Sequence, residues 1–387
     1  MKQQVILYGA FDRYNYGDNL MPILLEKYLR QYHSNKLDNV EFIYSSIRES
    51  DLSNYRCMPT KPMNELLDTV TNDAIIIIVG GEVLGASIGV LYTHVQNGLL
   101  ATKSLRLLGR VCPPLLNMLS KYSYHAAWDY PYLPSKKSFK NNVRVVYNTV
   151  GGKPPLSQRQ KITEADYISV RDQRTFDNVS GYSNPKLVPD SVLLASSVIN
   201  DSFFDQFVRK EIKELVSRKY ICIQACPYKV QFSADELAKE IDSSILTHNI
   251  GVILLPIGYA SGHDDVLFLE KVKSQVKNNI TLLDDLNVWE IMYVIAKSFA
   301  FFGTSLHGVI TAMSFLVPHF CINRDIVKLT SFLETWSVAP FNAPIEISSM
   351  CSSLDIFKGE DISKLKNSVD NAKNIISSSI GDIASLL

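Results

Sequence analysis

The sequence lacks an excess of charge, a cysteine framework and any long hydrophobic run. Its 387 residues carry 39 Lys and Arg against 39 Asp and Glu, so no net field directs it toward nucleic acid. Its six cysteines are scattered without a C-x-x-C pair, which fits a reducing compartment and predicts neither a disulfide framework nor a zinc site. No apolar run approaches the roughly 20 residues that span a bilayer. We therefore expect a cytoplasmic protein without a nucleic-acid partner.

A dinucleotide fingerprint is also missing, although strand and helix patterns alternate through most of the chain. The clearest buried strand is 74–79, and the first, 5–8, runs into a polar loop without G-x-G-x-x-G, so NAD is not predicted. The chain is too long for one small core. We predict an α/β fold with two Rossmann-like domains facing across a cleft, the GT-B-like arrangement. The expected segments are a first domain at 1–198, a linker at 199–218, a second domain at 219–355 and a helical tail at 356–387.

The segment 299–318 contains the strongest candidate for chemistry. A short apolar run turns through polar residues into a helical spacing that ends at a proline, so His307 stands where a strand passes into a helix. Ligands bind at this edge of open α/β sheets, and helix N–H groups favour anions there. The predicted anion-site residues are Thr304, Ser305 and Gly308, with His263 at the same sheet edge. The alternative is that His307 caps the helix or binds a backbone carbonyl.

Two loops of the first half are predicted to supply the facing wall. Asn15, Gly17 and Asp18 follow the first strand, where their polar groups suit a sugar or phosphate. An Asx-rich turn in which Asp18 caps a helix beginning near residue 19 explains the same residues. After the strand at 74–79 come Gly80, Gly81 and Glu82. Paired glycines let a ligand or a following helix approach the backbone closely.

Arginines at strand ends are candidate ligands for a carboxylate or phosphate. Arg171 and Arg174 follow the strand at 165–170, and Arg324 follows the last strand of the second half. The alternative for Arg171 is an intramolecular pair with Asp172 or Asp190.

The segment 86–142 differs from its surroundings in charge. It carries seven Lys and Arg and the single acid Asp129, together with many leucines and, further on, several aromatics. Pro113-Pro114 divides it into two expected helical pieces, which we interpret as an insertion at the rim of the site. The open alternatives are a solvated helical face, or peripheral contact of residues 99–140 with the inner face of a membrane that carries a lipid-linked glycan.

Taken in order, the landmarks resemble the polysaccharide pyruvyl transferase family. They are Asn15-Tyr-Gly-Asp18, Val79-Gly-Gly81, Ser169-Val-Arg-Asp172, Pro189-Asp190-Ser-Val-Leu and Ser305-Leu-His-Gly308. The resemblance implies a GT-B-like fold and transfer of the enolpyruvyl unit of phosphoenolpyruvate to two hydroxyls of a sugar. The acceptor would be an intermediate of a capsule, exopolysaccharide or cell-wall glycan.

The resemblance also implies residue roles. His307 matches the motif histidine, a general acid or base, and Arg171 matches an arginine that binds the donor. Many members have Arg-x-His-Gly where this chain has Ser305, so the arginine's charge must come from elsewhere if phosphoenolpyruvate is the donor. The seven histidines are dispersed, so we expect no metal and no cofactor beyond phosphoenolpyruvate as co-substrate.

Two other functions fit the same pattern. A GT-B glycosyltransferase would use a nucleotide sugar and need an acid for the ribose, for which Asp325 is the near candidate. A non-catalytic glycan-binding relative would have lost the motif arginine together with the activity.

Overall fold

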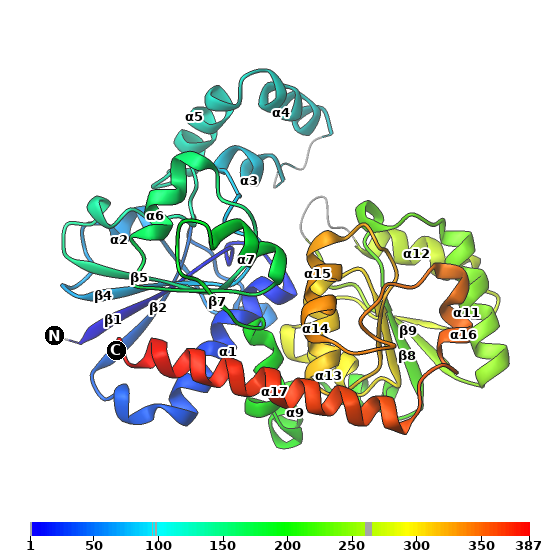
Figure 1. Ribbon diagram of the computed structural model, residues 1–387. Helices are drawn as coiled ribbons and strands as arrows, with labels where there is room; N and C mark the ends of the chain where they lie inside the picture. Colours follow the sequence, from blue (N-terminus) through cyan, green and yellow to red (C-terminus); the bar gives the residue numbers. More distant parts are fainter. Residues whose placement is uncertain (1, 95, 97–98, 260–264) are drawn as a thin grey trace.

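A computed structural model describes residues 2–94, 96, 99–259 and 265–387, which form two α/β domains, each with one parallel sheet (Figure 1). The first sheet has the order β3-β2-β1-β4-β5-β6-β7 and the second β10-β9-β8-β11-β12. The strands of the first are β1 (Gln3–Tyr8), β2 (Val40–Ser46), β3 (Lys61–Pro62), β4 (Ala74–Val79), β5 (Val143–Val150), β6 (Tyr167–Val170) and β7 (Lys186–Leu187). Those of the second are β8 (Tyr220–Gln224), β9 (Gly251–Leu254), β10 (Thr281–Leu282), β11 (Ala300–Gly303) and β12 (His319–Cys321).

Helices connect the strands of both sheets. Those of the first half are α1 (Tyr16–Tyr32), α2 (Met63–Leu66), α3 (Ile88–His94), α4 (Leu99–Val111), α5 (Pro113–Tyr124), α6 (Arg159–Thr163), α7 (Gln173–Val179) and α8 (Ala195–Val198). The predicted linker region holds α9 (Asp201–Phe207) and α10 (Lys210–Leu215). The remainder are α11 (Ala234–His248), α12 (Asp265–Gln275), α13 (Val288–Ala296), α14 (Leu306–Ser314), α15 (Val327–Trp336), α16 (Met350–Ser353) and α17 (Gly359–Ala384).

The first sheet is buried on both faces, which explains why β4 is apolar at every position. Ile75 and Ile77 belong to one hydrophobic cluster, while Ile76 and Ile78 belong to another on the opposite face. The cluster that contains Ile75 continues into the second domain, so the two domains share part of one core.

The last helix, α17, runs from the second domain back along the first (Figure 1). Its polar side chains bind the first domain directly: Ser377 Oγ accepts a hydrogen bond from Tyr28 at 2.7 Å, and Asp382 pairs with Lys186 at 2.7 Å. Ile376 and Ile380 on the same helix are fully buried. The final helix therefore holds the two domains together.

Two local predictions are wrong. Helix α1 begins at Tyr16 instead of near residue 19, because Asn15, not Asp18, is its N-cap and accepts a hydrogen bond from the Asp18 N–H. Asp18 lies in the first turn, where its charge suits the helix dipole.

Among its described residues, the segment 86–142 has three α-helices, α3, α4 and α5, where two helical pieces were predicted. Part of its aromatic stretch belongs to the core: Trp128 and Tyr132 are buried and pack with β-strand residues in the cluster that contains Ile76. Tyr132 also lines the cavity described below. Only α4 and α5 project from the body of the first domain (Figure 1).

Candidate active site

A cavity of about 190 Å³ lies between the two domains at the start of α1 and the start of α14. The first domain contributes the loop after β1, the turn after β4 and Arg171 after β6, while the second contributes the loop after β8 and the starts of α14 and α15. The polar and charged lining residues are Arg13, Asn15, Asp18, Glu82, Tyr132, Arg171, Lys229, Ser305, His307 and Lys328.

His307 is the second residue of α14 and faces this cavity from the second domain. Ser305 caps the helix through a hydrogen bond from the Gly308 N–H to its Oγ, at 3.3 Å. The imidazole Nε2 lies 3.5 Å from Oδ2 of Asp190, a fully buried carboxylate of the first domain. Burial opposes the charge on Asp190, but His307, Arg171 and the Val192 N–H hold its pKa below the usual value. His307 therefore lies next to an ionised carboxylate across the domain boundary.

Gly17 leaves room for the other edge of the same imidazole. A Cβ at position 17 would lie 1.7 Å from Nδ1 of His307, so the ring occupies the space of a missing side chain. The start of α1 therefore fixes where the histidine of the other domain can sit.

Arg171 is buried and surrounded by acids. Its Nη2 lies 2.8 Å from Glu82 Oε2, its Nη1 lies 3.4 Å from Asp190 Oδ2, and its Nε lies 3.8 Å from Asp172 Oδ2. Arg174 approaches the same Glu82 carboxylate at 2.7 Å. Burial raises the pKa of Glu82, but the two arginines outweigh that effect and lower it. The charge of Arg171 is thus balanced within the protein, as the intramolecular alternative predicted.

Three other cations, which sequence reasoning did not select, line the cavity: Arg13, Lys229 and Lys328. Within the described part of the chain, neither lysine forms an ion pair. Loss of solvent, with Lys229 and Arg171 nearby, lowers the pKa of Lys328 to about 8. The two lysines are therefore free to meet an anionic ligand, whereas Arg13 Nε lies 3.9 Å from Oδ1 of Asp12.

The remaining predicted residues divide into neighbours of the cavity and residues away from it. Thr304 accepts a hydrogen bond from the Cys226 N–H, and Gly308 and Gly80 pack against Phe301 and Met21 respectively. Arg324 does not reach the cavity, because its exposed side chain turns outward to Glu346. His263 lies outside the described residues.

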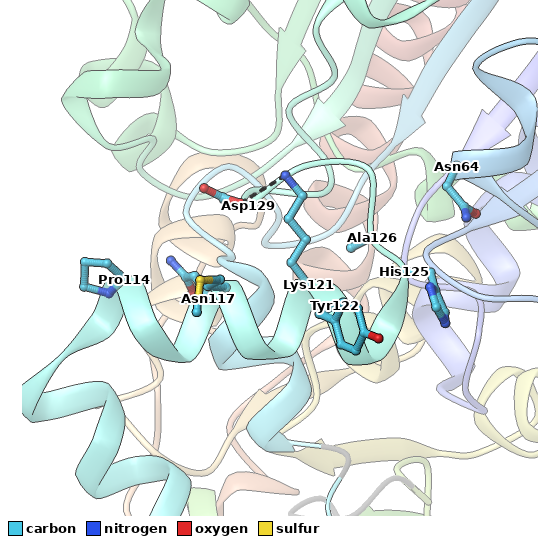
Figure 2. A pocket seen from close by; sticks show the side chains of 9 residues that line it. Asn64, Pro114, Asn117, Lys121, Tyr122, His125, Ala126 and Asp129 are labelled. Atoms are coloured by element: carbon cyan, nitrogen blue, oxygen red, sulfur yellow. Dashed lines mark ion pairs between the residues drawn. The ribbon is translucent and has the colours of Figure 1, made fainter.

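A second, wider groove lies on the surface of α5, with Lys121, Tyr122 and His125 along it (Figure 2). Its volume is about 750 Å³, and Lys121 pairs with Asp129 at 3.4 Å across it. None of the predicted site residues lines it, so the smaller cavity at His307 is the candidate active site. In the described ranges, no group of three or more His, Cys, Asp or Glu side chains could hold a metal ion.

The fold and this site are those of a two-domain α/β protein with a His–Asp pair at the domain boundary. The family model for polysaccharide pyruvyl transferase matches residues 15–326, and the chain therefore belongs to the polysaccharide pyruvyl transferase family. No curated protein matches the sequence.

Solved structures share the fold at low identity. The Staphylococcus aureus MnaA–UDP structure superposes with a TM-score of 0.54 at 11% identity, covering 98% of this chain and 94% of that one. The Methanocaldococcus jannaschii UDP-GlcNAc 2-epimerase, in complex with UDP-GlcNAc and UDP, gives 0.53 at 10% identity, covering 92% and 94%. The predicted GT-B-like arrangement is confirmed.

Proposed function

We propose that this protein transfers the enolpyruvyl group of phosphoenolpyruvate to a sugar diol of a capsular, exopolysaccharide or cell-wall glycan intermediate. The observation that carries the proposal is the contact of His307 with Asp190 in a cavity that Lys229 and Lys328 also line. A donor with a carboxylate and a phosphate matches those two unpaired cations. Membership of the family supports pyruvyl transfer to a polysaccharide. The donor and the type of glycan are part of this proposal.

The cations supply the affinity that the motif arginine would otherwise supply. Micromolar binding needs about 8 kcal/mol, and a helix N-terminus contributes only about 0.3–1 kcal/mol. Hydrogen bonds to charged groups contribute about 1.5–3 kcal/mol each. Lys229 and Lys328 together contribute about 3–6 kcal/mol, and Arg13, which also faces Asp12 at 3.9 Å, contributes part of the remainder. Arg171 keeps its three acids and holds Glu82 and Asp190 in place.

The reaction needs one site for proton transfer. A proton joins the methylene carbon of the donor while an acceptor hydroxyl oxygen bonds to the carbon that carries the phosphate. The second hydroxyl oxygen then bonds to the same carbon as the bond from that carbon to the phosphate oxygen breaks. Its proton leaves with the phosphate, and the product is a pyruvate ketal. His307 donates the first proton or removes the hydroxyl proton, and ionised Asp190 stabilises its protonated form. No metal or further cofactor is part of the proposed mechanism.

A nucleotide-sugar transferase is the second candidate, because the superposed structures from S. aureus and M. jannaschii contain UDP. The cavity of about 190 Å³ is small for a nucleotide sugar, since pockets for drug-sized ligands are typically about 300–1,000 Å³. Asp325, the expected ribose ligand, is exposed and accepts a hydrogen bond from Gln231 outside the lining. The geometry therefore favours the smaller donor.

Thermal-shift titration with phosphoenolpyruvate, UDP-sugars and GDP-sugars separates the candidates. A ligand that binds the folded state raises the melting temperature. Stabilisation by phosphoenolpyruvate alone supports pyruvyl transfer, stabilisation by a nucleotide sugar alone overturns it, and stabilisation by neither favours a glycan-binding role.

The His307→Ala variant tests the catalytic step. We expect loss of turnover with an unchanged melting temperature, while His33→Ala, at the end of α1, serves as the matched control. An active His307→Ala protein would remove the histidine from the mechanism.

A further inference from the structure

Helices α4 and α5 form a hairpin that leaves one apolar face without cover. A Cβ on Gly109 of α4 would lie 3.0 Å from Leu116 of α5, so the two helices pack closely on their inner sides. On α5 the buried residues Leu116, Ser120 and Tyr124 recur at helical spacing along that inner side. On another side of α5, Met118 and Tyr122 are exposed and line the wider groove together with Asn64.

Both helices of the hairpin carry exposed apolar residues. On α5 they recur at intervals of three and four residues, and the last turn of α4 extends them. We call this set the hairpin face: Leu107, Val111, Leu115, Met118, Leu119 and Tyr122. Exposure of its side chains ranges from 39% for Leu115 to 82% for Tyr122. Contiguous exposed apolar residues of this kind mark interaction surfaces.

Basic side chains of α4 border the hairpin face, and one acid, Asp129, lies in the groove beside Met118 and Tyr122. Lys103, Arg106 and Arg110 are exposed on α4. The single acid between residues 86 and 142, Asp129, already pairs with Lys121 at 3.4 Å. The surface therefore combines apolar side chains with an uncompensated positive charge.

We propose that the hairpin face docks onto a bilayer surface that contains anionic phospholipids. Apolar side chains flanked by Lys and Arg enter the interface between head groups and acyl chains, and the basic residues meet lipid phosphates. A second copy of this chain fits less well, because it would bring Arg106 and Arg110 of both copies together without acids. No described helix is long and apolar enough to cross a membrane, so the contact is peripheral.

The hairpin is connected to the cavity wall through α3. Gly89 of α3 donates its N–H to Asn117 of α5 at 3.1 Å, and Leu91 of the same helix lines the cavity at His307. Docking therefore places the site beside the bilayer surface. This inference goes beyond the proposed function, and its test does not require turnover.

Co-sedimentation of the full chain with vesicles tests the proposal. We expect binding to vesicles that contain phosphatidylglycerol and little binding to pure phosphatidylcholine. Met118→Glu/Tyr122→Glu is expected to lower the partition coefficient about tenfold or more. Arg106→Ala/Arg110→Ala is expected to lower it about fivefold for each charge removed, and added salt to lower it further.

Matched controls keep the test specific. Leu246→Glu changes an equally exposed apolar residue on α11, and Arg218→Ala/Lys366→Ala removes two exposed charges elsewhere. Both controls are expected to bind like the wild type, and all variants to keep its melting temperature. Absent binding to anionic vesicles, or a dimer that Met118→Glu/Tyr122→Glu separates while vesicle binding persists, would overturn the proposal.

Discussion

At position 17 a side chain larger than hydrogen would occupy the place of the His307 ring. Gly17→Ala puts a Cβ 1.7 Å from Nδ1, so the imidazole must move away from Asp190. We expect turnover to fall about 100-fold, as a misplacement of about 1 Å can produce. The free energy of unfolding should fall by about 1–3 kcal/mol from the displaced ring, a loss that the helix preference of Ala, about 1 kcal/mol, partly offsets. Steady-state kinetics and chemical denaturation measure the two effects.

The control is the same substitution at the start of another helix. Gly359 begins α17, and no atom lies within 4 Å of the position that a Cβ would take there. Gly359→Ala should therefore keep full turnover. Normal turnover of Gly17→Ala would show that the ring position does not limit catalysis.

Lys328 predicts a pH dependence of donor binding. Its amine is charged below a pKa of about 8, so affinity for phosphoenolpyruvate should fall as the pH rises through that value. Arginine stays charged above pH 12, and Lys328→Arg should keep its affinity through this range. Lys328→Met should bind about 10–150-fold more weakly at neutral pH, the loss of about 1.5–3 kcal/mol. Isothermal titration between about pH 6.5 and 9.5 makes the comparison, and a wild-type affinity that is flat with pH would exclude Lys328 as a ligand.

The sequence predicted site residues at His307 and in the loop of Gly17, because strand-to-helix junctions can be recognised from local patterns, and the structure places both at the cavity. It did not identify Arg13, Lys229 or Lys328, since a cationic side chain in a loop can turn toward a cavity or toward solvent. Arg324 shows the opposite outcome: it also follows a strand, yet it points outward to Glu346. Tertiary packing decides between the two.

At the scale of elements, the end of β4 depends on a left-handed turn. Gly80 and Gly81 have φ values of +59° and +82°, and the turn brings Glu82 to Arg171. We expect Gly81→Ala to lower the free energy of unfolding by about 1–2 kcal/mol. Gly81→Asn should cost less, because asparagine adopts this conformation more readily. Chemical denaturation measures the free energy of unfolding of both variants. Each variant adds the same Cβ near Val83. Equal losses of stability would therefore mean that the backbone conformation at position 81 is not the cause.

Element types could be predicted where one pattern dominates. The continuous apolar run of β4 indicated a strand buried on both faces, and the structure places it in the middle of the first sheet. The segment 86–142 was harder, because buried aromatics such as Trp128 and exposed ones such as Tyr122 have the same local sequence character. Whether one of these aromatic residues is buried depends on the residues that pack against it, and the local sequence does not show those contacts.

At the scale of the whole molecule, the shared hydrophobic cluster and α17 predict a single unfolding transition. Ile380 of α17 is fully buried in the cluster that spans both domains. Ile380→Ala should lower the free energy of unfolding by about 2–5 kcal/mol and move the entire transition. Differential scanning calorimetry measures it, and Ile356→Ala, half exposed before α17, is the control. Two separate transitions, of which only one moves, would contradict this coupling.

Two domains could be predicted from chain length and alternation, but their coupling could not. The local pattern of residues 356–387 indicates an amphipathic helix. That pattern does not indicate which domain the helix contacts. The hydrogen bond between Tyr28 and Ser377 joins residues far apart in the chain, which no local pattern indicates.

The position of α17 at the end of the chain also determines when the first domain can complete its folding during synthesis. While the ribosome is still translating the second domain, the first has all its strands but not the helix that binds Tyr28 and Lys186. The nascent chain therefore carries an incomplete first domain until residues 359–384 leave the exit tunnel, and chaperones have that interval in which to bind it.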